Sequence, residues 1–155
     1  MEMGVALAAL GAALAIGLSG AGSAIGLAMA GKASTGVISE KPELFGKVFV
    51  LQALPATQGI YGFLIAILIL LNVGLLGGNP LPLTEPQGWA YLAVGIGMGI
   101  SNLASGAFQG MMSGSSILMT GKDASLSTRG MTMTVMIETY AILGLLVSIL
   151  ILTGI

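Results

Sequence analysis

The sequence predicts an all-α integral membrane protein with four transmembrane helices arranged as two duplicated hairpins. Of the 155 residues, 55% are hydrophobic and 7% are charged, whereas a soluble domain carries about 25% charged residues. The mean hydropathy is +1.02, and the chain contains four apolar runs long enough to cross a bilayer. The last of these runs has a carboxylate, Glu138, near its middle. These three observations predict the fold class and indicate where its function lies.

The composition excludes several classes of function. The apolar runs take up nearly all of the chain, so no soluble catalytic domain is expected. The sequence has no cysteine and no histidine, which excludes disulfides, thiol catalysis and imidazole acid–base chemistry. Its net charge of −1 offers no polybasic surface for nucleic acid. We therefore expect neither an enzyme nor a nucleic-acid-binding protein.

The first predicted hairpin joins an apolar run over residues 4–31 to a second run over residues 46–76. No basic segment precedes the first run, so we expect a retained helix rather than a cleaved signal. Residues 32–45 form the polar connection between the two runs. A turn rich in glycine and proline follows at residues 77–88.

The second predicted hairpin joins runs over residues 89–121 and 130–154 through a polar connection at 122–129. Three of the four runs exceed the thickness of a bilayer, so we expect some helices to project into water on one side. The expected division of the chain is a first hairpin over 1–78, an extracytoplasmic turn over 79–87 and a second hairpin over 88–155.

The positive charges predict the orientation of both hairpins. All five belong to the two connections inside the hairpins, and none lies in the central turn or at the termini. They are Lys32, Lys41, Lys47, Lys122 and Arg129. Because cytoplasmic loops carry the excess of lysine and arginine, we expect both hairpin loops to be cytoplasmic and the termini extracytoplasmic.

The two hairpins are related by an internal repeat. Residues 62–70 match residues 144–152 at an offset of 82, and the same offset places Ala56 opposite Glu138 and Thr57 opposite Thr139. Two hairpins in the same orientation, related by duplication, explain this match. The first copy therefore has an alanine where the second has its carboxylate.

The first helix of each hairpin is rich in glycine, and the second is bulkier. Glycines spaced four residues apart place small residues on one helical face, where backbones can approach closely and drive helix association in lipid. The ladder residues are Gly22, Gly26, Gly106, Gly110 and Gly114. Two interpretations remain open: the glycine-rich helices form an inner layer surrounded by bulky ones, or the ladders pack inside a single four-helix bundle.

Glu138 is the one ionisable residue deep in an apolar run. No lysine, arginine or histidine lies within eight residues of it, and an acidic group at the centre of a membrane helix costs about 2.5–3.5 kcal/mol. Counted inward from the charged ends at about 1.5 Å per residue, Thr57, Gln58 and Gln109 reach a similar depth of roughly 15–20 Å. We therefore expect residues of three helices to meet Glu138 at one level.

Pro55 adds a backbone oxygen to this level. Inside a helix, proline lacks an N–H donor and clashes with the carbonyl four residues earlier, so carbonyls near the kink become free. A carboxylate, a hydroxyl, two amide oxygens and a carbonyl form an all-oxygen cage of the kind that hard cations prefer. A single carboxylate balances one positive charge, which favours a monovalent ion, Na⁺ rather than K⁺.

Other interpretations of these polar residues stay open. In one alternative, ordinary hydrogen bonds between helices are formed by Thr57, Gln58 and Gln109. Tyr61 lies one turn beyond Thr57 and Gln58, where it would either donate its hydroxyl to Glu138 or act as a packing aromatic.

Three segments resemble a known family. Residues 54–63, 108–110 and 137–144 read LPATQGIYGF, FQG and IETYAILG, and they closely resemble the rotor-ring subunit (the K or c proteolipid) of bacterial sodium-translocating V-type ATPases. The similarity covers the whole chain. The last segment marks V-type proteolipids in general, and its combination with Thr57, Gln58 and Gln109 marks the sodium version. Ala56 stands where relatives often have glycine, a small departure.

The resemblance implies a site and a mechanism. The implied Na⁺ ligands are Glu138, Thr57, Gln58, Gln109 and the backbone carbonyl of Leu54, with Tyr61 bonded to Glu138. Identical subunits would form a ring in a bacterial cell membrane, each carrying one ion as a neutral ion–carboxylate pair that can face lipid. The implied partners are a stator subunit with a membrane arginine and the central-stalk subunits, while ATP is handled elsewhere in the machine.

Several alternatives accompany this expectation. The ring would carry protons if Glu138 acted alone. A small four-helix multidrug exporter also uses one buried glutamate, but it needs an aromatic pocket for lipophilic cations, and aromatic residues make up only 5% of this chain. A channel would need a continuous polar stripe, which none of the four runs offers.

Overall fold

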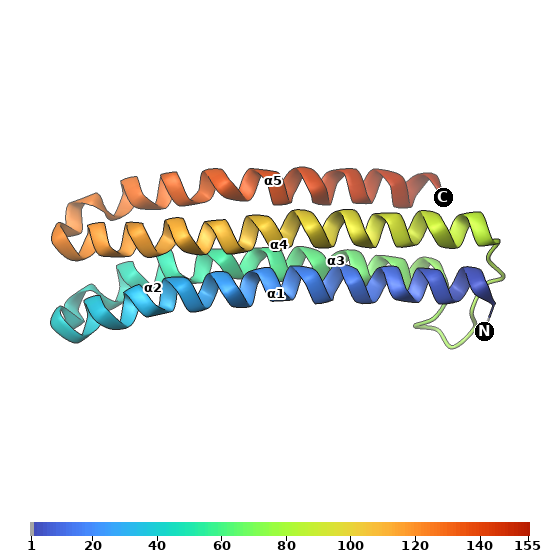
Figure 1. Cartoon of the computed structure of the whole chain (residues 1–155), viewed down its shortest axis with the longest axis horizontal. Helices are drawn as coiled ribbons and strands as arrows, with labels where there is room; N and C mark the ends of the chain where they lie inside the picture. Colours follow the sequence, from blue (N-terminus) through green and yellow to red (C-terminus); the bar gives the residue numbers. More distant parts are fainter. Residues whose placement is uncertain (1) are drawn as a thin grey trace.

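The computed structural model describes residues 2–155 and is helical throughout that range apart from short connections (Figure 1). In chain order the elements are α1 (Met3–Glu40), η1 (Pro42–Leu44), α2 (Phe45–Ala53), η2 (Leu54–Ala56), α3 (Thr57–Asn72), α4 (Glu85–Lys122), η3 (Ala124–Leu126) and α5 (Ser127–Gly154), where η marks a 3-10 helix. Four helical segments in the described part of the chain are long and apolar enough to cross a membrane. The predicted fold class, four membrane helices in an all-α chain, is confirmed.

The connection predicted at residues 32–45 is mostly helix, so that prediction was wrong. α1 continues past the end of the apolar run to Glu40, and it stops there because Pro42 disfavours helical geometry in the residue before it. Lys41, with φ −135° and ψ 72°, makes the break. A polar helical extension therefore projects beyond the apolar part of α1, as the length of the run predicts.

The central turn also ends earlier in the sequence than predicted. α4 begins at Glu85, because Thr84 caps it with a reciprocal pair of hydrogen bonds to Gln87 and because Pro86 suits a first helical turn. Residues 85–87, predicted as turn, are thus the start of α4. That the two hairpins are separate units divided at this turn stays a prediction.

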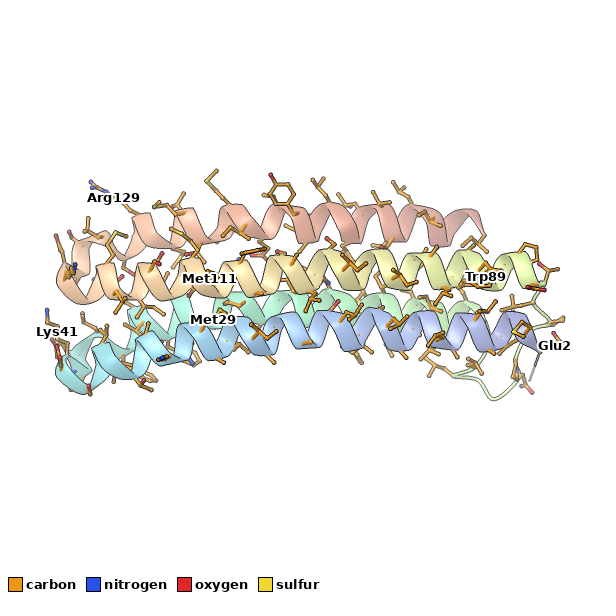
Figure 2. The ribbon with its side chains drawn as sticks, viewed as in Figure 1. Glu2, Met29, Lys41, Trp89, Met111 and Arg129 are labelled. Carbon is orange, nitrogen blue, oxygen red and sulfur yellow. The ribbon has the colours of Figure 1, made fainter. Side chains whose placement is uncertain are left out.

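The four membrane helices form one bundle. α1 and α4 lie side by side, α3 packs mainly on α1, and α5 packs mainly on α4 (Figure 1). The two hairpin loops lie at one end of the bundle, and the central turn, the start of α1 and the end of α5 lie at the other (Figure 1). Figure 2 shows Lys41 and Arg129 at the loop end, opposite Glu2 and Trp89. The positive charges are therefore gathered at one end.

The glycine ladders are occupied inside the bundle. A Cβ added to Gly22 would lie 2.6 Å from the carbonyl oxygen of Asn102, and one on Gly106 would lie 2.7 Å from the carbonyl carbon of Gly22. A Cβ on Gly110 would overlap the backbone of Gly26, whereas Gly114 has room for one. The ladders thus bring α1 and α4 into backbone contact within one chain, and an inner layer of a larger ring stays a prediction.

The outward faces of α3 and α5 are apolar. Large side chains point away from the bundle and have 55–69% of their surface exposed, namely Phe63, Leu71, Val147 and Leu150. Apolar surface on this scale is what a membrane helix presents to lipid rather than what a soluble monomer exposes. Both helices therefore have one face in the bundle and one for lipid or a neighbouring subunit.

Candidate ion-binding site

The carboxylate of Glu138 lies inside the bundle and is 8% exposed. The Tyr61 hydroxyl on α3 donates a 2.6 Å hydrogen bond to its Oε1. The side-chain Nε2 of Gln109 on α4 donates a longer bond of 3.4 Å to its Oε2. Each carboxylate oxygen therefore has a partner from a different helix, so the three helices meet at the level that the sequence predicts. Of the two interpretations of Tyr61, the structure shows the hydrogen bond.

Two buried amides form the next layer of the site. Gln58 and Gln109 have no exposed surface, and Gln58 Nε2 donates to Gln109 Oε1 over 2.6 Å. The second N–H of Gln58 points to Ser105 Oγ at 3.2 Å, and Gln109 Nε2 also reaches the carbonyl oxygen of Thr134 at 3.3 Å. Because their nitrogens are occupied, the amides have a defined direction, with the oxygen of Gln58 turned elsewhere.

The oxygen of Gln58 faces the break in the second membrane helix. η2 interrupts that helix at Pro55, and the Thr57 hydroxyl lies 3.1 Å from the carbonyl oxygen of Leu54 and 3.4 Å from Gln58 Oε1. Hydroxyl, carbonyl and amide oxygens thus gather in one small space. These are the three neutral ligand types that the sequence predicts for the cage.

The carbonyls near Pro55, which the sequence predicts to be free, are hydrogen-bonded in the structure. The carbonyl that Pro55 directly deprives of its donor is that of Leu51, and the Ser113 hydroxyl on α4 donates to it instead. The Leu54 carbonyl is not free either, since it accepts the backbone N–H of Thr57 as well as its hydroxyl. It joins the cluster because the tight 3-10 turn tips it toward the Thr57 side chain, and it keeps a lone pair for an ion only if that hydroxyl turns its proton away.

Several serines and one asparagine complete the network. Asn102 Nδ2 donates to Ser19 Oγ at 3.0 Å and to the backbone oxygen of Gln58 at 2.9 Å, and so links α4 to α1 and α3. Its Oδ1 is a buried acceptor without a partner among residues 2–155. Ser23 accepts the Gly59 N–H at 2.7 Å. The sequence offered a signal for these serines, since the offset of 82 pairs Ser19 with Ser101 and Ser23 with Ser105.

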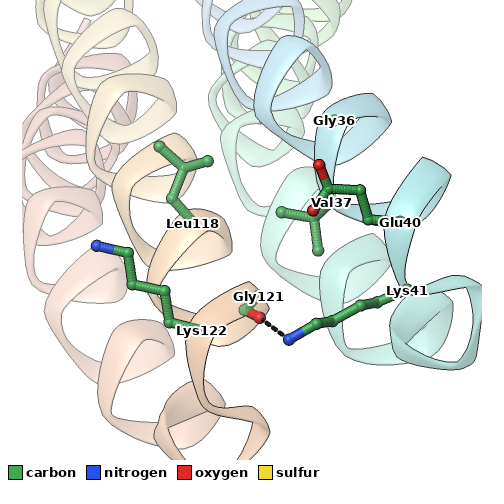
Figure 3. Close-up of a pocket in the computed structure, with 7 residues that line it drawn as sticks. All are labelled: Gly36, Val37, Glu40, Lys41, Leu118, Gly121 and Lys122. Atoms are coloured by element: carbon green, nitrogen blue, oxygen red, sulfur yellow. Dashed lines mark hydrogen bonds between the residues drawn. The ribbon is translucent and has the colours of Figure 1, made fainter.

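A separate pocket lies at the loop end of the bundle, away from the carboxylate. It has a volume of about 520 Å³ and is lined by ends of α1 and α4, including Glu40 and Lys122. Figure 3 shows Lys41 reaching across it to donate a 2.6 Å hydrogen bond to the carbonyl oxygen of Gly121. This contact ties the last turn of α4 to the first hairpin loop, and it adds no group to the site around Glu138.

The comparisons with known proteins agree with this architecture. The family model for the ATP synthase C-subunit matches the chain twice, at residues 10–69 and 92–151. The two matches start 82 residues apart and end 82 residues apart, which is the offset of the internal repeat. A duplicated membrane hairpin with one buried carboxylate defines the class of the proteolipids. The chain belongs to the ATP synthase C-subunit family.

Two relatives place the chain more closely within the family. It is 41% identical over 149 residues to the A-type ATP synthase subunit K of Methanocaldococcus jannaschii, covering 96% of this chain and 63% of the relative. It is 38% identical over 119 residues to the V-type sodium ATPase subunit K of Enterococcus hirae, covering 77% of this chain and 72% of the relative. The chain thus spans less than two thirds of the length of the archaeal relative.

Proposed function

We propose that this chain is the ion-carrying rotor-ring subunit of a rotary A/V-type ATPase and that its cargo is Na⁺. The observation that carries the proposal is the meeting of α3, α4 and α5 at Glu138, where Tyr61 and Gln109 bond the carboxylate. Family membership supports the rotor part of the proposal. The relative named as a sodium ATPase subunit supports the choice of ion.

The kind of oxygen in the site favours an alkali ion. Thr57, Gln58 and the Leu54 carbonyl would supply neutral oxygens, and Glu138 would supply the charge. Gln109 Oε1 accepts the Gln58 N–H and would join them through its second lone pair. Hard cations prefer such ligands, and one carboxylate balances one positive charge. Residues 2–155 contain no cluster of three or more acidic, histidine or cysteine side chains that could hold a metal ion, which disfavours a dedicated divalent site.

A proton carrier would need less than this site provides. A proton requires only the carboxylate, whereas the pair of fully buried glutamines and the helix break at Pro55 would then serve packing alone. The exporter alternative needs an aromatic pocket for a lipophilic cation at the acid. Tyr61 instead donates its hydroxyl to the carboxylate. Family membership favours the rotor over the exporter.

The geometry supports a transport cycle in which a charge is exposed only briefly. With Na⁺ bound, the carboxylate forms a neutral pair that can face lipid at low cost, because Tyr61 fixes one oxygen and Gln109 fixes the other. A membrane arginine on a stator subunit would compete for Glu138 and release the ion. The hairpin loops, which carry the positive charges, would face the cytoplasm and the central stalk.

The test is protection of Glu138 from a hydrophobic carbodiimide in purified protein. At neutral pH, millimolar Na⁺ is expected to block labelling, while the same concentration of choline chloride has no effect. Thr57→Val removes one oxygen from the site and is expected to raise the half-protecting Na⁺ concentration about tenfold.

The duplication offers a matched control. Thr139 occupies the position equivalent to Thr57, but it is exposed and its hydroxyl returns to the Met136 carbonyl. Thr139→Val is expected to leave protection unchanged. Labelling that responds to pH but never to Na⁺ would reject the sodium assignment in favour of proton transport.

A further inference from the structure

The side-chain amide of Gln58 is held in one direction by Ser105. Gln58 Nε2 donates to Ser105 Oγ at 3.2 Å, and Ser105 Oγ in turn donates to the backbone oxygen of Ile137 at 3.1 Å. The serine is 5% exposed. Since the Ile137 carbonyl is a fixed acceptor on α5, the Ser105 proton points to it, and a lone pair of Ser105 remains for the amide N–H.

The direction of this amide matters because its two ends are chemically opposite. The oxygen of a glutamine can bind a cation, whereas its NH₂ group carries positive partial charge and cannot. In the observed direction both N–H groups are occupied, by Ser105 and by Gln109 Oε1, and the oxygen lies beside Thr57 Oγ1. Without Ser105, one buried N–H of Gln58 loses its partner, and only the bond to Gln109 Oε1 still favours the observed direction.

The backbone beneath Gln58 is fixed separately. Asn102 Nδ2 donates to the Gln58 carbonyl oxygen over 2.9 Å, so the main chain is held whether or not Ser105 is present. Loss of Ser105 should therefore disturb the side-chain amide and leave the helix in place.

We infer that Ser105 is a positioning residue, which acts together with Gln109 Oε1 so that Gln58 presents its oxygen rather than its nitrogen to the ion. This inference rests on the proposed Na⁺ function and names a residue that determines affinity from outside the set of oxygens around the ion. It acts through Gln58, and the Ile137 carbonyl is its anchor, one residue before Glu138 on α5.

The chain supplies a matched control for the structural part of this role. Ser101 lies one turn earlier on α4, and its hydroxyl donates to the Tyr140 carbonyl of α5 at 3.1 Å. It forms the same kind of bond between α4 and α5 as Ser105 does, but it is not among the hydrogen-bond partners of Gln58, whose amide N–H groups go to Ser105 and Gln109. Ser101→Ala therefore removes the interhelical bond without touching the amide.

The experiment measures the Na⁺ concentration that half-protects Glu138 from carbodiimide, together with the melting temperature of the detergent-solubilised protein. Ser105→Ala is expected to raise the half-protecting concentration about tenfold. Ser101→Ala is expected to change the half-protecting concentration less than twofold. It should lower the melting temperature by about as much as Ser105→Ala does. Ser105→Thr keeps the hydroxyl and should restore protection to within twofold of the unchanged protein.

The outcomes separate the two proposals. If Na⁺ fails to protect the unchanged protein, the sodium function itself is rejected. If Na⁺ protects the unchanged protein and Ser105→Ala shows the same half-protecting concentration, the role of Ser105 is rejected while the sodium function stands. Should Ser105→Ala fail to fold, Ser105→Cys is used instead, because its side chain is still small but is a weaker hydrogen-bonding group. An unchanged half-protecting concentration for that variant rejects the role.

Discussion

The two hairpins pack alike but differ in chemistry. A Cβ on Gly62 would run into Ser19, and a Cβ on Gly144 would lie 2.7 Å from Ser101 Oγ, so contacts at positions 82 residues apart are the same in both copies. At the level of Glu138 the similarity ends. The first copy breaks its helix at η2, whereas α5 runs unbroken from Ser127 to Gly154.

Under the proposed function, this difference divides one task between the two copies. The first copy contributes neutral groups and a phenol, namely the Leu54 carbonyl, Thr57, Gln58 and Tyr61, while the second contributes Glu138 and Gln109. The second membrane helix tightens into the 3-10 turn η2 at Pro55, whereas Glu138 lies on the uninterrupted helix α5. Only one charge then has to be kept stable in the membrane for each pair of hairpins.

The largest expected effect comes from removing that charge. Glu138→Gln leaves the proposed ion cage without its negative group, and loss of one partner from a buried ion pair costs about 3–5 kcal/mol. At about 1.4 kcal/mol per tenfold change, Na⁺ transport by the assembled ATPase should fall at least a hundredfold. Uptake of labelled Na⁺ into proteoliposomes measures this.

The control for this prediction is Glu43→Gln, which removes an exposed carboxylate in the first hairpin loop. Its transport should match that of the unchanged protein. Substantial Na⁺ transport by Glu138→Gln would mean that the first copy alone can carry the ion, and the division of roles between the copies would be wrong.

A smaller effect, on the melting temperature, is expected where α4 of the second hairpin contacts α1 of the first. A Cβ at Gly110 would overlap the backbone of Gly26, and overpacking of this kind costs about 1–3 kcal/mol. Gly110→Ala should therefore lower the melting temperature of the purified protein.

Gly36→Ala is the matched control, because Gly36 is exposed on α1 with nothing within 4 Å of a Cβ. Alanine there should leave the melting temperature unchanged or raise it, since alanine favours a helix by about 1 kcal/mol over glycine. Equal losses for both variants would show that contact between α1 and α4 is not what Gly110 provides.

The sequence predicted the fold and the level of the site for a physical reason. A helix rises by a constant amount per residue, so counting from the charged ends placed Gln58 and Gln109 near Glu138 before any contact was known. Helix ends were harder to predict, because hydropathy marks where the membrane stops, and α1 continues as a polar helix to Glu40.

The direction of each amide was beyond prediction. It depends on which carbonyls of α5 face α4, here those of Thr134 and Ile137, and that follows from the rotation of two helices about their axes. For the same reason the sequence does not distinguish Ser105 from a small packing residue. Ser113 was missed because its partner, the Leu51 carbonyl, is a backbone atom on another helix.

The smallest expected effect comes from removing the bond that Tyr61 of the first hairpin donates to Glu138 of the second. Tyr61→Phe removes the 2.6 Å bond to Glu138 Oε1, but Oε2 keeps its bond from Gln109. We therefore expect a loss of about 1 kcal/mol, or roughly a fivefold rise in the half-protecting Na⁺ concentration. Tyr140→Phe is the control, because Tyr140 is 69% exposed on the outer face of α5. If the two variants behaved alike, the phenol of Tyr61 would be a packing group, and the carboxylate would be held by α4 and α5 alone.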